Sequence, residues 1–376
     1  MDDRHLSPSP KVVAMVGAFP PPTHGMAAVN AAVRKRLQAA GADLLVIDLA
    51  ASSLDRALIV RLGRLPKVLR GLVRLSCMRG LRNGVLYMSV SGGWGQIYEM
   101  VFLLIARLRH LHVLLHHHSF AYVDAPNFLT ALLTKLAGNT ATHVTLSPSM
   151  SARIQATHPS VRHVLSISNA VLLLREAADA PHTRQRLHII GFLSNVSAEK
   201  GVFDYLDLCA AACNRQLPVH GKLAGPFQDT ETERQVRERL DMLPEVEYMG
   251  PQYGEQKDSF YASIDALVFP THYVNEAEPL VVHEAMSRGI PVIAYGRGCI
   301  PEIVSPACGL VVPPGDAFIP AALAQIEAWL AKPQAFEAAS VAAIARFNAL
   351  YAENLPRWEE LQAELLGEWL HKARRN

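Results

Sequence analysis

The stretch from Phe269 to Val304 constrains the fold of this chain more than any other part of the sequence. An apolar run ends at Phe269, a turn-rich loop follows, and an amphipathic segment from Leu280 to Arg288 leads into a second apolar run. Pro279 suits the start of a helix, and Gly289 suits the position just past its end. The pattern therefore predicts a strand–loop–helix–strand unit of a parallel sheet. In such sheets ligands bind beside the carboxyl ends of the strands, where the N–H groups of a helix N-terminus attract an anion.

Two glutamates flank the expected start of this helix. Glu276 lies in the loop and Glu284 lies in the helix, with seven residues between them. A carboxylate near a phosphate site is repelled unless it accepts hydrogen bonds from hydroxyl groups of the ligand. The arrangement therefore predicts a ligand that carries both phosphate and hydroxyl groups, which is a nucleotide sugar. The alternative is a surface helix with two solvated glutamates.

This segment resembles the Glu-x7-Glu signature of the family-4 retaining glycosyltransferases, which belong to the group 1 glycosyltransferases. Further elements of the family pattern match in the same order, namely Glu284-Ala285-Met286, Gly289, Pro291-Val292, Ala294, Gly298 and Glu302-Ile303-Val304. The resemblance implies an α/β protein of GT-B architecture, in which two Rossmann-like domains face across a cleft and the C-terminal helix crosses back to the first domain. It also implies that Glu276 is catalytic and contacts hydroxyls of the donor sugar, and that Glu284 holds the ribose.

Length and composition agree with a protein of two domains. The chain has 376 residues, of which 50% are hydrophobic and 19% are charged, so each half can bury a core. We expect an acceptor-side domain over residues 1–172, a nucleotide-sugar-binding domain over 173–354 and a C-terminal helix over 355–376 that packs on the first domain. We also expect Pro356 to interrupt the last helical segment.

The charge is distributed unevenly along the chain. Residues 1–170 contain 18 Lys and Arg against 7 Asp and Glu, whereas residues 171–376 contain 18 against 27. The basic half includes residues 56–82, where a basic amphipathic helix is expected to begin at Pro66. Such a helix binds peripherally to an anionic membrane, or it is an outer helix of the sheet with a solvated basic face. Nothing in the sequence resembles a nucleic-acid-binding module, so we expect no nucleic-acid partner.

The compartment is predicted from the cysteines and from the absence of a long apolar run. The five cysteines form no Cys-x-x-Cys pair, which is typical of a reducing cytoplasm. No run reaches the length of a transmembrane helix. We therefore expect a cytoplasmic protein, in one interpretation at the inner face of the plasma membrane.

Two features of the first half align with the family. Lys11–Gly17 predicts a strand, and the loop after it contains Gly25, which would let the backbone approach the donor phosphate. A later strand ends in three histidines, and strand alternation places His116 and His118 on one face. The resemblance assigns His118 to the catalytic position near the donor sugar and the acceptor, with His116 as the second choice. Metal binding by the histidines is an alternative that lacks a third ligand at suitable spacing.

The resemblance also implies a set of residues that hold the donor diphosphate. The family carries an Arg and a Lys-Gly pair after the first strand of the second domain. Lys200-Gly201 matches the pair, and Asn195 occupies the position of the Arg. The N–H groups of Leu280 and Val281, at the expected helix N-terminus, complete the set.

These residues together imply a retaining glycosyltransferase that moves a hexosyl group from a UDP- or GDP-sugar to a hydroxyl acceptor. The preferred acceptor is a lipid-linked or membrane-associated glycan in envelope or exopolysaccharide biosynthesis. No two aspartates are spaced as Asp-x-Asp, so we expect no metal and no other cofactor. The alternatives are a nucleotide-sugar epimerase of the same architecture, a glycogen- or trehalose-type synthase, and a non-catalytic nucleotide-sugar-binding protein.

Overall fold

The computed structural model describes residues 12–51, 63–78, 81, 84–173 and 182–366. Parts of the predicted basic segment 56–82, of the predicted domains 1–172 and 173–354 and of the predicted C-terminal helix 355–376 lie outside these residues. The chain divides into two compact units, one formed by residues up to Ile167 together with those from Asn354 onward, and the other by Ser168–Glu353.

The first unit is built on a sheet of six parallel strands. The strands are β1 (Val12–Gly17), β2 (Asp43–Asp48), β3 (Val85–Val90), β4 (His112–His117), β5 (Thr142–Thr145) and β6 (His163–Ser166). Their order in the sheet is β2-β1-β3-β4-β5-β6. Every residue of β1 and β3 is buried. Their unbroken apolar runs are typical of parallel strands that are covered on both faces.

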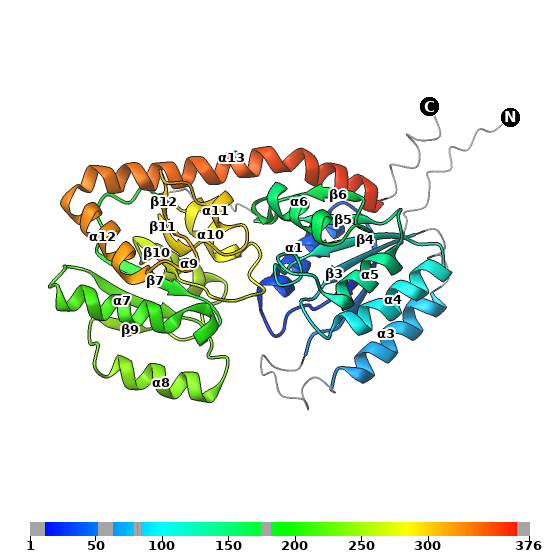
Figure 1. Ribbon diagram of the computed structural model, residues 1–376, viewed down its shortest axis with the longest axis horizontal. Helices are drawn as coiled ribbons and strands as arrows, with labels where there is room; N and C mark the ends of the chain where they lie inside the picture. Colours follow the sequence, from blue (N-terminus) through cyan, green and yellow to red (C-terminus); the bar gives the residue numbers. More distant parts are fainter. Residues whose placement is uncertain (1–11, 52–62, 79–80, 82–83, 174–181, 367–376) are drawn as a thin grey trace. The chain divides into compact units, whose positions relative to one another are not determined.

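Helices connect these strands (Figure 1). They are α1 (Gly25–Ala39), α3 (Leu65–Cys77), α4 (Gln96–Leu108), α5 (Phe128–Ala137) and α6 (Pro148–Thr157). Local signals place several helix starts. The side chain of Asn127 accepts a hydrogen bond from the N–H of Thr130 at the start of α5, and Ser147 with Pro148 begins α6 in the same way.

The second unit contains another sheet of six parallel strands, in the order β12-β11-β10-β7-β8-β9. The strands are β7 (Ile189–Leu193), β8 (His220–Ala224), β9 (Val246–Tyr248), β10 (Ala266–Phe269), β11 (Val292–Tyr295) and β12 (Gly309–Val312). The helical elements are η1 (Asn169–Leu172), η2 (Ala198–Lys200), α7 (Val202–Asn214), α8 (Thr230–Leu240), α9 (Glu255–Ala262), α10 (Leu280–Ser287), α11 (Ile300–Ile303), α12 (Phe318–Ala331) and α13 (Pro333–Leu366). The predicted strand–loop–helix–strand unit is therefore β10, α10 and β11.

Helix α13 continues through Pro356, so the predicted interruption is wrong. A proline inside a helix removes one backbone hydrogen bond and costs about 3 kcal/mol. Buried side chains on both sides of the proline, including Leu350 and Trp358, hold the helix in place. Near its end, Glu364 accepts hydrogen bonds from Thr142 Oγ1 at 2.7 Å and shares one of 2.6 Å with His112 Nε2, within the first unit.

In the part of the chain that the structure describes, no helix is both long and apolar enough to span a membrane.

Candidate functional site

The strand order of the second sheet reverses between β7 and β10. These two strands lie side by side, with Ala266 opposite Ile190 and Leu267 opposite Gly191. The chain leaves β7 toward β8 on one side and leaves β10 toward β11 on the other. The two loops therefore diverge at the carboxyl edge of the sheet, and in open parallel sheets the crevice at such a switch point is the usual ligand site.

The two loops bring Lys200 and Glu276 together. Lys200 Nζ lies 2.6 Å from Glu276 Oε2, and the side chain of Glu276 is only 8% exposed. Thr271 Oγ1 donates a second hydrogen bond to the same carboxylate oxygen at 3.1 Å. The ammonium group also lies 4.5 Å from the ring centroid of Tyr273, which adds a cation–π contact. The crevice thus contains a cation and a carboxylate whose charges balance.

Backbone geometry explains the position of Lys200. The side chain of Ser197 accepts a hydrogen bond from the N–H of Lys200 at the end of the short helix η2. Gly201 follows with φ of +82°, and a Cβ at this position would lie 2.0 Å from the carbonyl oxygen of Pro270. Only glycine fits such a conformation and such a close approach. Gly201 is therefore needed to place the end of the β7 loop against the end of β10.

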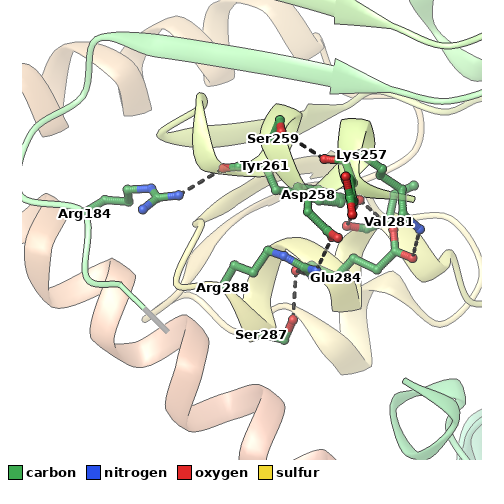
Figure 2. Close-up of polar contacts among 10 residues, drawn as sticks. Arg184, Lys257, Asp258, Ser259, Tyr261, Val281, Glu284, Ser287 and Arg288 are labelled. Carbon is green, nitrogen blue, oxygen red and sulfur yellow. Dashed lines mark hydrogen bonds and ion pairs between the residues drawn. The ribbon is translucent and has the colours of Figure 1, made fainter. Parts of the chain in front are cut away.

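Glu284 is held by two side chains of α9, as Figure 2 shows. Its Oε1 lies 2.6 Å from Lys257 Nζ, and its Oε2 accepts a hydrogen bond of 2.7 Å from the hydroxyl of Tyr261. Arg288, which directly follows α10, donates to the carbonyl oxygen of Glu284 at 3.1 Å. Sequence reasoning did not identify Lys257 or Tyr261, because no spacing rule links α9 with α10.

A third glutamate, Glu278, was also missed as a structural anchor. It is buried and accepts a hydrogen bond of 2.6 Å from Ser168 Oγ and another from the backbone N–H of Asn169. His283 Nε2 lies 3.1 Å from Glu278 Oε1. These contacts fix the loop before α10 to η1, at the beginning of the second unit. Since about 110 residues separate the partners, the sequence alone contained no signal for the contact.

The remaining predicted residues of the second unit lie around the same loops. Leu280 and Val281 are the first two residues of α10. In the first turn of an α-helix the backbone N–H groups have no acceptor within the helix. Asn195 lies half-buried in the loop after β7. The segment after β7 thus contains Asn195 and Lys200. The segment after β10 contains Glu276 and leads into α10.

In the first unit, Gly25 is the first residue of α1, which follows β1 as predicted. The ring of His24 caps the helix by accepting a hydrogen bond from the N–H of Ala27. A Cβ added to Gly25 would meet no atom within 4 Å. Packing within the protein therefore does not require glycine at position 25.

His118 follows β4 directly, and its ring lies beside that of His116 with 4.0 Å between the centroids. His116 shares a hydrogen bond of 2.6 Å with the hydroxyl of Tyr87, whereas His118 Nε2 is buried and has no partner among the described residues. Burial, with a smaller effect of His24, lowers the pKa of His118 to about 3. His118 is therefore a neutral imidazole at pH 7, with one ring nitrogen that can still form a hydrogen bond.

His117 points to the opposite face of the sheet, where it packs among other protein side chains. It lies between Tyr122 and His143, with hydrogen bonds of 3.0 and 2.9 Å. Burial and the neighbouring histidines hold its pKa well below the usual value. Within the described ranges, no group of three or more His, Cys, Asp or Glu side chains is arranged to hold a metal ion.

The first sheet has a switch point of its own, between β1 and β3. A pocket at this position is lined by Gly17 and Met26 from the β1 side and by Ser91 and Glu99 from the β3 side. Glu99 Oε1 accepts a hydrogen bond of 3.0 Å from the N–H of Ser91, and its Oε2 is buried without a partner among the described residues.

Comparison with known proteins gives one family. Residues 175–344 match the family model described as "Glycosyl transferases group 1". A stretch of 130 residues is 30% identical to the GDP-mannose-dependent alpha-mannosyltransferase of Mycobacterium tuberculosis (strain CDC 1551 / Oshkosh) and covers 34% of this chain. The aligned stretch spans 31% of that relative, about a third of its length.

Solved structures resemble nearly the whole chain. Sucrose-phosphate synthase from Thermosynechococcus elongatus matches with a TM-score of 0.68 and 19% identity, over 97% of this chain and 100% of that chain. Anabaena HepE in complex with UDP-glucose matches with a TM-score of 0.66 and 17% identity, over 94% and 100% of the two chains. At these identities the likeness shows the fold, and the predicted α/β fold class of GT-B type is confirmed.

Proposed function

Because the chain belongs to the group 1 glycosyl transferases through residues 175–344, we propose that it transfers a hexosyl group from a nucleotide sugar to a hydroxyl group of an acceptor. The observation that carries this proposal is the Lys200–Glu276 pair at the switch point of the second sheet. The pair would supply a cation for the diphosphate and a carboxylate for the sugar hydroxyls, at the place where an open parallel sheet usually binds its ligand.

The donor diphosphate would bind to positive and hydrogen-bonding groups around this crevice. Lys200 would supply the positive charge, Asn195 would supply an amide, and Leu280 and Val281, in the first turn of α10, would donate backbone N–H groups. Gly25, which has open space around it, would allow a close approach of its backbone to the phosphates. Glu284, already oriented by Lys257 and Tyr261, would accept hydrogen bonds from the ribose.

In the reaction, the bond between the anomeric carbon and the diphosphate oxygen breaks, a bond to the acceptor oxygen forms, and the proton of the acceptor hydroxyl passes to the departing diphosphate. Negative charge grows on the leaving diphosphate, where the ammonium group of Lys200 stabilises it. Glu276 would accept hydrogen bonds from hydroxyls of the donor sugar and fix its orientation. His118, being neutral, would bind a hydroxyl of the sugar or the acceptor through Nε2. We propose that the configuration at the anomeric carbon is retained and that no metal takes part.

The base of the donor is proposed to be uracil or guanine. HepE is described in complex with UDP-glucose, and the mycobacterial relative is described as GDP-mannose-dependent. For the acceptor, the pocket at the switch point of the first sheet is a candidate site. We propose a lipid-linked or membrane-associated glycan of envelope or exopolysaccharide synthesis, used on the cytoplasmic side of the membrane. The basic first half of the chain supports this choice.

Release of nucleoside diphosphate from UDP- and GDP-sugars, with a membrane lipid extract as acceptor source, tests the proposal. We expect Glu276→Gln to lower turnover by about 100-fold or more, because it removes a charged contact at the reacting sugar. Glu247→Gln, on the edge strand β9, serves as the control and should leave turnover unchanged. EDTA should have no effect, and the anomeric configuration of the product, read by NMR, should match that of the donor. Normal turnover in a folded Glu276→Gln protein would contradict the assignment.

A further inference from the structure

Exposed apolar side chains gather on three helices of the first unit. Among the described residues, fourteen large hydrophobic side chains are exposed, and four of them, Met242, Tyr253, Val274 and Val341, are spread over the second unit. The other ten belong to α3, α4, α5 and the loop before α4, and are called the apolar face. They are Leu65, Leu69, Val73, Trp94, Ile97, Val101, Leu104, Leu108, Phe128 and Leu132.

The spacing of these residues makes continuous stripes. On α4 the exposed apolar residues are Ile97, Val101, Leu104 and Leu108, which follow one another at helical intervals of four, three and four. A surface helix of a soluble protein normally has polar residues on its outward face. Helix α4 packs against α3 on one side and α5 on the other, as Figure 1 shows. The stripes of the three helices are therefore neighbours, and a patch of this extent marks an interaction surface.

The exposed charged side chains of α3, α4 and α5 themselves all have one sign, although Lys67 also pairs with Asp48 of β2 at 3.6 Å. The exposed charged side chains of the three helices are basic, namely Lys67, Arg70, Arg74, Arg107 and Lys135. The one acidic residue in these helices, Glu99, is buried. The complementary partner therefore offers an apolar layer together with negative charge.

We propose that the apolar face docks on an anionic lipid bilayer. The apolar stripes would enter the boundary between headgroups and acyl chains, and the Lys and Arg side chains would lie at the level of the lipid phosphates. Trp94 and Phe128 are 71% and 80% exposed and stand at the starts of α4 and α5, toward the carboxyl edge of the sheet. Trp and Phe side chains are favoured at the boundary between the lipid headgroups and the acyl chains. The inference specifies the membrane contact of the proposed function and to that extent rests on it, although docking itself requires no transfer reaction.

Co-sedimentation with vesicles tests the docking. We expect the full chain to bind vesicles of phosphatidylcholine that contain phosphatidylglycerol, to bind pure phosphatidylcholine vesicles much less, and to dissociate as salt rises. Leu108→Glu should lower binding by about tenfold or more, because it places a carboxylate among the lipids. Met242→Glu is the matched control, since Met242 is 73% exposed and Leu108 is 72% exposed. Arg70→Gln should lower binding about fivefold, as expected for one basic residue near a charged surface.

Two results would overturn the proposal. The first is that the chain does not bind phosphatidylglycerol vesicles, or that neither Leu108→Glu nor Arg70→Gln changes its binding. The other is a stable dimer that Leu108→Glu dissociates and that binds no vesicles, because the face would then belong to a second copy of the chain. Nucleotide binding is measured without vesicles. A protein that binds nucleotide but no vesicles contradicts the docking alone, and the reverse result contradicts the proposed function alone.

Discussion

At the scale of single residues, buried titratable groups of the first unit have pKa shifts of opposite direction. Burial lowers the pKa of His143 to about 4 and holds the pKa values of His116 and His117 well below the usual value. Burial also raises the pKa of Glu99 to about 7, although hydrogen bonds from Ser91 lower it in part. The folded protein therefore keeps all four side chains uncharged in slightly acidic solution.

The histidines predict a loss of stability in acid. Below pH 6.5 the unfolded chain binds protons that the folded histidines reject, so the free energy of unfolding falls as the pH decreases from 6.5 toward 4. Each histidine contributes up to about 1.4 kcal/mol per pH unit in this range. Urea unfolding of the first unit between pH 7.5 and 5 should show this dependence, and His143→Gln should reduce it. A pH-independent midpoint would contradict the burial of neutral histidines.

Glu99 predicts the opposite dependence. Its raised pKa means that the folded state binds a proton more tightly than the unfolded chain, so its contribution to stability is lost as the pH rises from about 4.5 to about 7. Glu99→Gln keeps an oxygen for the N–H of Ser91 and cannot ionise. We expect this variant to be more stable than the wild type at pH 8, by roughly 1–3 kcal/mol. Equal stability of the two proteins at pH 8, measured by urea unfolding, would show that the carboxylate is well solvated.

At the scale of secondary-structure elements, the two glycines that the family pattern places near the donor diphosphate have different structural roles. Gly201 has a positive φ and no room for a Cβ, whereas Gly25 has open space around it. We expect Gly201→Ala to destabilise the second unit by about 2 kcal/mol or more, because strain and a clash combine. Gly25→Ala should leave the melting temperature nearly unchanged. If the donor phosphates approach this backbone, Gly25→Ala should still weaken nucleotide binding. Unchanged nucleotide affinity would remove Gly25 from the site.

The elements themselves could largely be predicted from the sequence. Apolar runs such as those of β1, β3 and β10, with glycine and proline at their ends, are local signals of buried strands and helix ends. The family pattern predicted Lys200 and Glu276 as separate site residues, but it did not predict the ion pair between them. Contacts such as Lys257–Glu284 and Ser168–Glu278 depend on tertiary packing, which no local pattern reports. The course of α13 through Pro356 likewise follows from packing, which outweighed the preference of proline.

At the scale of the whole molecule, the two units carry different chemical groups. The first unit carries the apolar face with its basic residues and the pocket at β1 and β3, and the second carries the crevice with Lys200 and Glu276. The uneven charge of the sequence, 18 basic against 7 acidic residues in positions 1–170, has a structural counterpart in the exposed basic side chains of α3, α4 and α5. The apolar face differs from the rest of the described surface in its exposed apolar side chains together with its basic ones, and not in net charge alone.

The most direct test of the central claim is the thermal stability of the protein with UDP, GDP and ADP, with and without EDTA. One nucleoside diphosphate at 100 times its dissociation constant should stabilise the fold by about 2.7 kcal/mol. The shift should persist in EDTA and be much smaller in Lys200→Met, whose unliganded fold should remain intact. The account predicts this pattern for UDP or GDP. If no nucleotide raises the melting temperature, or if Lys200→Met responds like the wild type, the crevice between β7 and β10 is not the donor site.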